Sequence, residues 1–183
     1  MTPESIIRDY YPPGSQTLDI LLRHAEQVAK KGLEIARRVS HLEPDTGFIE
    51  EAAMLHDIGI FMTRAPAIGC FGGSPYICHG LLGRNLLESI ELPRHALVSE
   101  RHTGAGISRD NIIEHGLPLP LRDMIPLSIE EIIVCVADKY FSKNPSKSDL
   151  TMTRVDIFQE LKTIDASHGE RFSTWADLLG IRS

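Results

Sequence analysis

Histidine and aspartate side chains carry most of the chemistry that this sequence of 183 residues offers. It contains eight histidines beside only three cysteines. Four of the histidines and two aspartates fall on the apolar faces of predicted helices: His24, His56, Asp57, His79, His102 and Asp138. A carboxylate on an inward face is costly unless a positive or hydrogen-bonding group meets it. No inward lysine or arginine is evident there, so the six side chains would satisfy one another around a metal. Imidazole and carboxylate ligands suit iron, manganese, zinc or cobalt.

The adjacent pair His56 and Asp57 sets a geometric condition on such a site. Consecutive helical residues diverge by about 100°, so both can reach one metal only from a helix end that points at it. We expect Gly59 to supply that end. Because Asp57 has two carboxylate oxygens, it could also bridge two metals.

The elements that must position these residues are predicted to be helices throughout. Helical spacing of apolar residues and capping signals predict helices at about 18–39, 46–57, 76–90, 93–102, 108–115, 129–141, 153–164 and 168–179. No strand pattern is convincing. The segment 129–136 alone could pass for a buried strand, but its length and the cap at Ser128 favour a helix. We predict an all-α fold forming a single helical domain over 1–183, with its core at about 18–145 and C-terminal helices at 150–180 packed on it.

Two connections stand out between these helices. The loop 60–75 is rich in glycine and proline and is long enough to suggest a function, either as a lid or as a variable connection. The segment 142–149 is predicted to be a polar loop.

Composition and charge narrow the class of protein. With 42% hydrophobic and 24% charged residues, the chain is neither disordered nor collagen-like. Its net charge of −6 argues against a general nucleic-acid binder. No apolar run approaches the roughly 20 residues of a membrane span, and the start lacks the layout of a signal peptide. The cysteines form no CxxC pair. We therefore expect a reduced, cytoplasmic protein with a small-molecule partner and no membrane association, and a homo-oligomer is left open.

Two motifs carry a resemblance to a known family. The run MLHDIG at 54–59, with His24 upstream and Ala137-Asp138-Lys139 downstream, resembles the HD-domain superfamily of metal-dependent phosphohydrolases. The order His…His-Asp…His…His…Asp resembles its dinuclear branch, and the resemblance covers about 18–145. The run ERHTGAGI at 100–107 is similar to an HDIG-type family of unknown biochemistry and to the symmetrical diadenosine tetraphosphate hydrolases of the superfamily.

The resemblance implies an HD-domain-like bundle, one or two divalent transition metals and a division of the ligands between them. One metal would be held by His24, His56, Asp57 and Asp138, and a second by His79 and His102 with Asp57 bridging. Asp57, His79 and His102 are accordingly predicted as catalytic residues. Two metals activate water at neutral pH and stabilise charge on phosphoryl oxygens. We expect a phosphohydrolase that uses such water to cleave a small phosphoester, for example a nucleotide.

Phosphate recognition is predicted from the basic residues. Many relatives carry Lys or Arg directly after the HDIG run, whereas this chain has Ile60. The substitutes that we consider for substrate binding are Arg64, Arg84, Arg101, Lys139 and Lys143, each of which could equally be a solvated surface charge. The Gly-Tyr-Pro signature of cyclic-di-GMP phosphodiesterases is absent, which argues against that activity. No residue is assigned as the general acid; Glu100 and Arg101 lie near His102 in the sequence.

Two other functions remain open. The same ligand set resembles that of the HD-type mixed-valent diiron oxygenases, which cleave carbon bonds with dioxygen. A non-catalytic module that binds a nucleotide or metal and regulates a partner is the other alternative, against which the complete ligand set weighs. The remaining histidines fall near predicted helix ends or loops, where we expect solvated or capping roles. They are His41, His95, His115 and His168.

Overall fold

The computed structural model describes residues 2–144, 146 and 150–182 of the chain. Its helices are α1 (Pro3–Tyr10), α2 (Gln16–Arg38), α3 (Thr46–Leu55), α4 (His79–Ser89), α5 (Pro93–Arg101), α6 (Arg109–Glu114), α7 (Ile129–Asp138), α8 (Arg154–Ile164) and α9 (Ala166–Leu178). Short 3-10 turns lie at η1 (Ser40–Leu42), η2 (Ile60–Met62), η3 (Pro66–Ile68) and η4 (Tyr76–Cys78). The predicted all-α class is confirmed. Positions 145 and 147–149 of the predicted polar loop lie outside the described residues.

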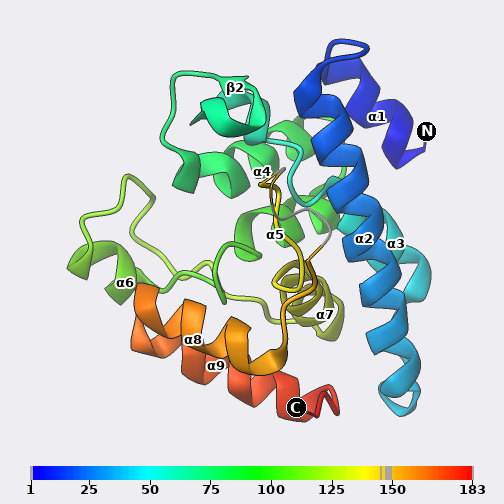
Figure 1. The fold of residues 1–183 in the computed structure, drawn as a ribbon, viewed down its shortest axis with the longest axis vertical. Helices are drawn as coiled ribbons and strands as arrows, with labels where there is room; N and C mark the ends of the chain where they lie inside the picture. Colours follow the sequence, from blue (N-terminus) through cyan, green and yellow to red (C-terminus); the bar gives the residue numbers. More distant parts are fainter. Residues whose placement is uncertain (1, 145, 147–149, 183) are drawn as a thin grey trace.

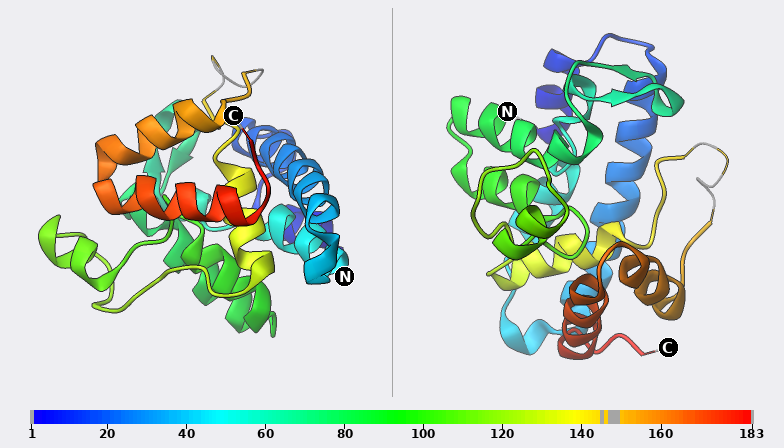
Figure 2. Two further views of the ribbon diagram at one scale, coloured as in Figure 1. Left: turned by 90° about the horizontal axis from the view of Figure 1, so that it is seen from below. Right: turned by 90° about the vertical axis from the view of Figure 1, so that its left-hand side faces the viewer.

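Helix α7 is the centre around which the other helices pack. It contacts α2, α3, α5 and α9, while α4 lies against α5 and α8 against α9. The long α2 runs along one side of the molecule, and the α8–α9 pair covers the end opposite α1 (Figure 1). Figure 2 shows α8 and α9 side by side as an antiparallel pair. Among the described helices, none combines the length and the apolar character that a membrane crossing requires.

The surroundings of α7 explain why its sequence resembled a strand. Every residue from Glu131 to Asp138 is buried, so the helix has no solvent-facing side on which polar residues would recur at helical spacing. Its start is defined locally, because the Ser128 hydroxyl accepts a hydrogen bond from the Glu131 amide. A capped helix buried on all sides is therefore the outcome of a continuous apolar run.

Helix α1 was not predicted from the sequence. Thr2 caps it by accepting a hydrogen bond from the Ser5 amide, and Pro3 occupies its first turn. Its buried face joins a core cluster with α2 and the segment after α3. The Tyr11 hydroxyl donates a hydrogen bond to the Ile58 carbonyl at 2.7 Å. The N-terminal segment therefore packs against the HDIG run and is hydrogen-bonded to it.

Within the described residues, the loop 60–75 departs from the expectation that there are no strands. Strands β1 (Arg64–Ala65) and β2 (Cys70–Phe71) pair antiparallel, with Arg64 opposite Phe71. Gly69 between them has a φ of 76°, a left-handed conformation that favours glycine. A two-residue pairing is too short to leave an alternating sequence pattern, which is why the sequence did not reveal it.

Candidate metal centre

Helix ends bring the six predicted ligands together in the interior. His56 follows the last residue of α3, His102 follows the last residue of α5, and Asp138 is the last residue of α7. His79 is the first residue of α4, and His24 alone lies in the middle of a helix. None of the six is more than 5% exposed. Three helix C-termini thus converge on one buried point, and their dipoles favour a cation there.

The first ligand group consists of His24, His56, Asp57 and Asp138. The Nε2 atom of His24 lies 2.8 Å from Asp138 Oδ1 and 3.4 Å from Asp57 Oδ2. The Nε2 atom of His56 lies 3.1 Å from Asp57 Oδ2 and 3.5 Å from Asp138 Oδ1. Two imidazole nitrogens and two carboxylate oxygens therefore converge on one position.

The second ligand group consists of Asp57, His79 and His102. Here Asp57 uses its other oxygen, Oδ1, which lies 3.4 Å from His79 Nε2 and 3.3 Å from His102 Nε2. The two Nε2 atoms are 3.0 Å apart. Asp57 is thus shared between the two groups, with one carboxylate oxygen directed to each.

Backbone carbonyls fix which nitrogen of three histidines faces the centre. The Nδ1 atom of His56 lies 2.6 Å from the carbonyl oxygen of Ala53, three residues earlier. His79 and His102 repeat this arrangement at 2.7 and 2.8 Å with the carbonyls of residues 76 and 99. A carbonyl only accepts, so each Nδ1 carries a proton and donates it. In the neutral form of each ring the lone pair is then on Nε2, which is the arrangement of metal-ligating histidines.

In the second ligand group, buried acceptors face one another with little support from donors: the Thr103 hydroxyl lies 3.5 Å from His79 Nε2, at the limit of a hydrogen bond. Burial lowers the pKa of His79 to about 3 and also lowers the pKa of His102, so both rings are neutral at neutral pH. Their lone pairs face each other at 3.0 Å, and Asp57 Oδ1 accepts no hydrogen bond from any described residue. Buried acceptors placed in this way repel one another unless a cation lies between them.

The spacing of these atoms matches that of ligands on a common ion. Zinc binds imidazole nitrogen and carboxylate oxygen at about 2.0–2.2 Å, so two ligands on one ion lie roughly 3.0–3.5 Å apart. The ligand-atom separations given above run from 2.8 to 3.5 Å. The residues therefore fit one or two divalent metals of the kind expected from the sequence.

Electrostatics within the first ligand group favours ionised carboxylates. Burial by itself would raise the pKa of Asp57, but the charges of His56 and Lys143 outweigh it and hold that pKa well below its usual range. The pKa of Asp138 is also held well below its usual range, because Lys139 and Lys143 outweigh burial. Burial would lower the pKa of His56, yet the neighbouring Asp57 and Asp138 raise it to about 9. The first ligand group therefore presents two carboxylates and an imidazole that must release a proton to bind metal.

Gly59 serves the centre differently from what the sequence suggested. It does not end α3, which stops at Leu55, and its φ of −82° is open to any residue. Instead, a Cβ at this position would lie 2.3 Å from the His79 carbonyl oxygen and 2.5 Å from the Gly83 amide nitrogen. The absence of a side chain lets the HDIG run lie against the backbone of α4. This contact holds Asp57 and His79 at their short separation.

The five predicted substrate cations occupy different environments. Lys139 and Lys143 lie at the centre, with their ammonium nitrogens 2.6 Å from Asp138 Oδ2 and 2.7 Å from Asp57 Oδ2. Arg84 is paired with Glu88 and Glu100, Arg101 is paired with Glu131, and Arg64 lies exposed on β1. Glu100, considered for proton transfer, is buried between Arg84 and Arg122. Only the two lysines therefore approach the six ligands.

A pocket of about 720 Å³ adjoins these lysines. Asp138, Lys139, Lys143 and Tyr76 line it, together with two acidic residues of α8, Asp156 and Glu160. Burial raises the pKa of Tyr76 to about 12, so its hydroxyl is protonated at neutral pH. The pocket gives a small molecule a route to Asp138, with positive charge beside it.

The four remaining histidines lie outside the six-ligand cluster, and one of them corrects the sequence analysis. His41 is exposed, and His115 lies 2.9 Å from Asp165 on the surface, near Glu114. His168 was expected at a solvated helix end, but it is only 5% exposed and its ring lies against Gly104. The sequence did not reveal this burial because it arises from a contact between distant segments.

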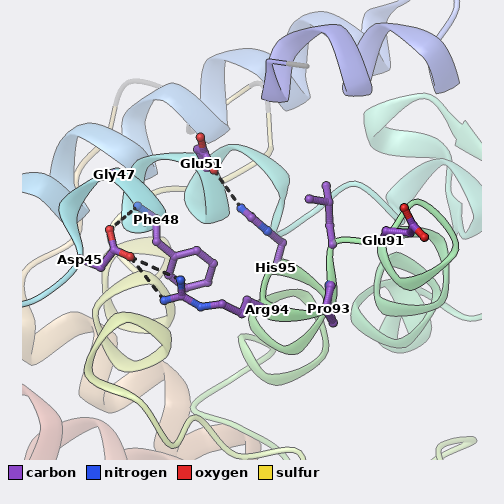
Figure 3. Close-up of a pocket in the computed structure, with 9 residues that line it drawn as sticks. Asp45, Gly47, Phe48, Glu51, Glu91, Pro93, Arg94 and His95 are labelled. Atoms are coloured by element: carbon purple, nitrogen blue, oxygen red, sulfur yellow. Dashed lines mark hydrogen bonds and ion pairs between the residues drawn. The ribbon is translucent and has the colours of Figure 1, made fainter.

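His95 borders a second hollow, which lies between the beginnings of α3 and α5 (Figure 3). Its Nε2 atom lies 3.3 Å from Glu51, and Arg94 lies over the Phe48 ring beside Asp45. These groups largely satisfy one another, so the hollow resembles an ordinary charged surface rather than a second site.

Comparison with known families agrees with this geometry. The profile of the HD domain matches residues 21–142, which include all six ligands. The chain belongs to the HD domain family. Membership supports a metal-dependent phosphohydrolase in general terms, and the His/Asp cluster provides groups that could hold the metal.

Relatives of this HD domain protein include both stand-alone and larger proteins. An uncharacterized protein of Methanocaldococcus jannaschii is 32% identical over 121 residues, which cover 64% of each chain. The tRNA (cytidine(56)-2'-O)-methyltransferases of Picrophilus torridus and Thermoplasma volcanium are 34% and 32% identical over 126 residues. Those matches cover 68% of this chain but only 32% of each enzyme. The chain thus spans under two thirds of the length of these relatives.

Solved structures show the same fold. The HD domain of the L. monocytogenes phosphodiesterase PgpH, in complex with cyclic-di-AMP, aligns with a TM-score of 0.54 and 14% identity over 88% of both chains. A second structure of that HD domain aligns with the same TM-score and identity, over 88% of this chain and 90% of its own length. At this identity the likeness concerns the fold.

Proposed function

We propose that this protein is a hydrolase of small phosphoesters that uses a two-metal centre. The first ligand group would hold one metal and the second ligand group the other, with Asp57 between them. The observation that carries the proposal is the cluster of buried acceptors around Asp57, in which two neutral imidazoles face each other at 3.0 Å. Such a cluster is stable only around a cation.

The chemistry that bound metals supply is a water activated at neutral pH and positive charge for the phosphoryl oxygens. The chain provides the orientation and the spacing of the groups that would hold these metals. Hydrogen bonds to the carbonyls of residues 53, 76 and 99 keep Nε2 of His56, His79 and His102 directed at the centre. Asp57 holds the two groups at a fixed separation through its two oxygens. Because all of these side chains are buried, bulk water does not screen their charges.

Substrate binding is proposed at the pocket beside Asp138. Lys139 and Lys143 line it and offer the ammonium groups that a phosphate would require. We propose no substrate contact for Arg84 or Arg101, which do not line this pocket and are paired with glutamates. A pocket of about 720 Å³ is large enough for a nucleotide, and the net charge of −6 disfavours a nucleic-acid polymer.

The test combines metal content with phosphate release. The protein is purified without added metal and analysed by plasma mass spectrometry, then assayed on p-nitrophenyl phosphate, its bis-ester and a panel of nucleotides. We expect one or two transition metals per chain and release of phosphate or phosphoester product. Asp57→Asn should lose most of the metal and at least about 10–100-fold in rate, which is the loss that follows removal of a group that only supports a metal ligand.

Asp9→Asn is the matched control, because Asp9 is exposed on α1 and belongs neither to the ligand groups nor to the lining of the adjoining pocket. It should retain both metal and activity. Unchanged metal content in Asp57→Asn would refute the centre. Metal binding without turnover of any ester would refute the hydrolase and favour the regulatory module, while oxygen uptake with a mixed-valent iron signal would favour the oxygenase.

A further inference from the structure

One lysine lies inside the metal centre rather than at its edge. The Nζ atom of Lys143 is 2.7 Å from Asp57 Oδ2 and 3.9 Å from Asp138 Oδ1. Its side chain is only 15% exposed, although the residue lies beyond the end of α7. An ammonium group is buried to this extent only where carboxylates compensate its lost hydration. Lys143 therefore acts as a counter-ion to both aspartates.

The two oxygens that Lys143 approaches are the ones that face the first ligand group. Asp57 Oδ2 lies 3.1 Å from His56 Nε2, and Asp138 Oδ1 lies 2.8 Å from His24 Nε2. A metal held by this group draws on these same oxygens. Since two cations this close repel strongly, the ammonium and the metal cannot share the position.

Lys139 provides a contrast within the same cluster. Its Nζ atom lies 2.6 Å from Asp138 Oδ2, the carboxylate oxygen that Lys143 does not approach. Its contact with Asp138 thus leaves Oδ1 available to a metal. Both lysines add one positive charge near the aspartates, but only Lys143 occupies the oxygens of the first ligand group.

We propose that Lys143 is an internal counter-ion that the first metal displaces, and that its released ammonium group then binds the substrate phosphate in the adjoining pocket. This inference rests on the proposed metal centre. Lys143 already lines that pocket, so a rotation of its side chain is sufficient to expose the charge there. Metal loading would thereby also prepare the phosphate site.

The displacement has a measurable consequence for metal affinity. A protein that binds a ligand only in one of its states has its affinity reduced by the fraction of molecules in that state. While Lys143 lies inside, the first ligand group is not available, so wild-type affinity is lower than the ligands alone would give. Removing the ammonium group should therefore tighten metal binding.

The experiment compares Lys143→Met with Lys139→Met in the full chain. Both variants remove one positive charge and keep a similar side-chain volume. The affinity of the metal-free proteins for Zn²⁺ is measured by competition with a chromophoric chelator. We expect Lys143→Met to bind the first Zn²⁺ about tenfold tighter than wild type or more, which corresponds to about 1.4 kcal/mol, and Lys139→Met to show a clearly smaller gain. Damage to the structure would weaken binding, so a gain beyond that of Lys139→Met identifies competition.

A second measurement needs no variant. Acetylation of lysines by an amine-reactive reagent is followed by mass spectrometry in metal-free and Zn²⁺-loaded wild-type protein. Lys143 should be protected without metal and reactive with it, whereas Lys30, which is exposed on α2, should react equally in both.

The outcomes separate this inference from the proposed function. If wild-type protein binds no Zn²⁺, the metal centre fails and the inference fails with it. If it binds Zn²⁺ but Lys143→Met binds no tighter, or only as much tighter as Lys139→Met, the centre stands and displacement is refuted. Equal acetylation of Lys143 in both forms would also refute displacement.

Discussion

Replacing Gly59 by alanine tests whether close backbone packing holds the two ligand groups together. The added Cβ would lie 2.3 Å from the His79 carbonyl oxygen and 2.5 Å from the Gly83 amide nitrogen. An ordinary contact requires at least 3.4 Å, so α4 must move by about 1 Å relative to the HDIG run. Both opposing atoms belong to the backbone, and no change of rotamer can relieve the contact.

The expected cost follows from two opposing terms. Overpacking of this kind destabilises by about 1–3 kcal/mol, and a clash with backbone lies at the upper end. Alanine at a permitted φ restricts the unfolded chain and returns about 0.4–1 kcal/mol. We therefore expect Gly59→Ala to lower the free energy of unfolding by about 2 kcal/mol. For a chain of this length, that lowers Tm by about 4–8 °C.

The same movement should affect one ligand group more than the other. Asp57 and His79 belong to the two segments that are pushed apart, whereas His24 and Asp138 lie on α2 and α7. We expect Gly59→Ala to retain the first metal and to lose the second, so that zinc stoichiometry falls from two to one per chain. Unfolding in urea and zinc titration of the same preparation measure both effects.

Gly73→Ala is the control from the same loop region. A Cβ at Gly73 meets nothing within 4 Å, and its φ lies outside the left-handed range. This variant should unfold within about 0.5 kcal/mol of wild type and bind two zinc ions. If Gly59→Ala matches Gly73→Ala in stability and in zinc stoichiometry, close packing at Gly59 does not position the centre, and our reasoning about it is wrong.

Two further predictions concern stability away from the ligands. Glu100 is buried between Arg84 and Arg122, so Glu100→Ala leaves Arg122 without its partner and Arg84 with only the exposed Glu88. It should cost about 2–4 kcal/mol in urea unfolding, whereas Glu88→Ala removes only the exposed partner of Arg84 and should cost under about 1 kcal/mol. Equal costs would contradict the role of burial. Burial lowers the pKa of His168 to about 4, below its value of about 6.5 in the unfolded chain. The unfolded state therefore binds more protons between these values, and stability should fall as the pH drops from 6.5 to 4, by up to about 3 kcal/mol from this residue. His168→Gln should weaken that dependence in unfolding measured at pH 7 and 5, and an unchanged slope would argue against a buried neutral His168.

The sequence alone was sufficient for the parts of this protein that depend on local rules. Capping residues such as Ser128 and the helical recurrence of apolar residues predicted the helices, since both signals act within one or two turns. The sequence also singled out the six candidate ligands, because each of these polar side chains stood on an apolar helix face, where an unpartnered polar group is costly.

Contacts between distant segments decided the rest. The sequence does not show that Gly59 meets the backbone of α4, that Lys143 enters the centre or that His168 is buried against Gly104. Each of these depends on how helices far apart in the chain approach one another. A residue's type and its neighbours in sequence set its possible chemistry. Its burial and its charged partners select among those possibilities, and both exist only once the chain has packed.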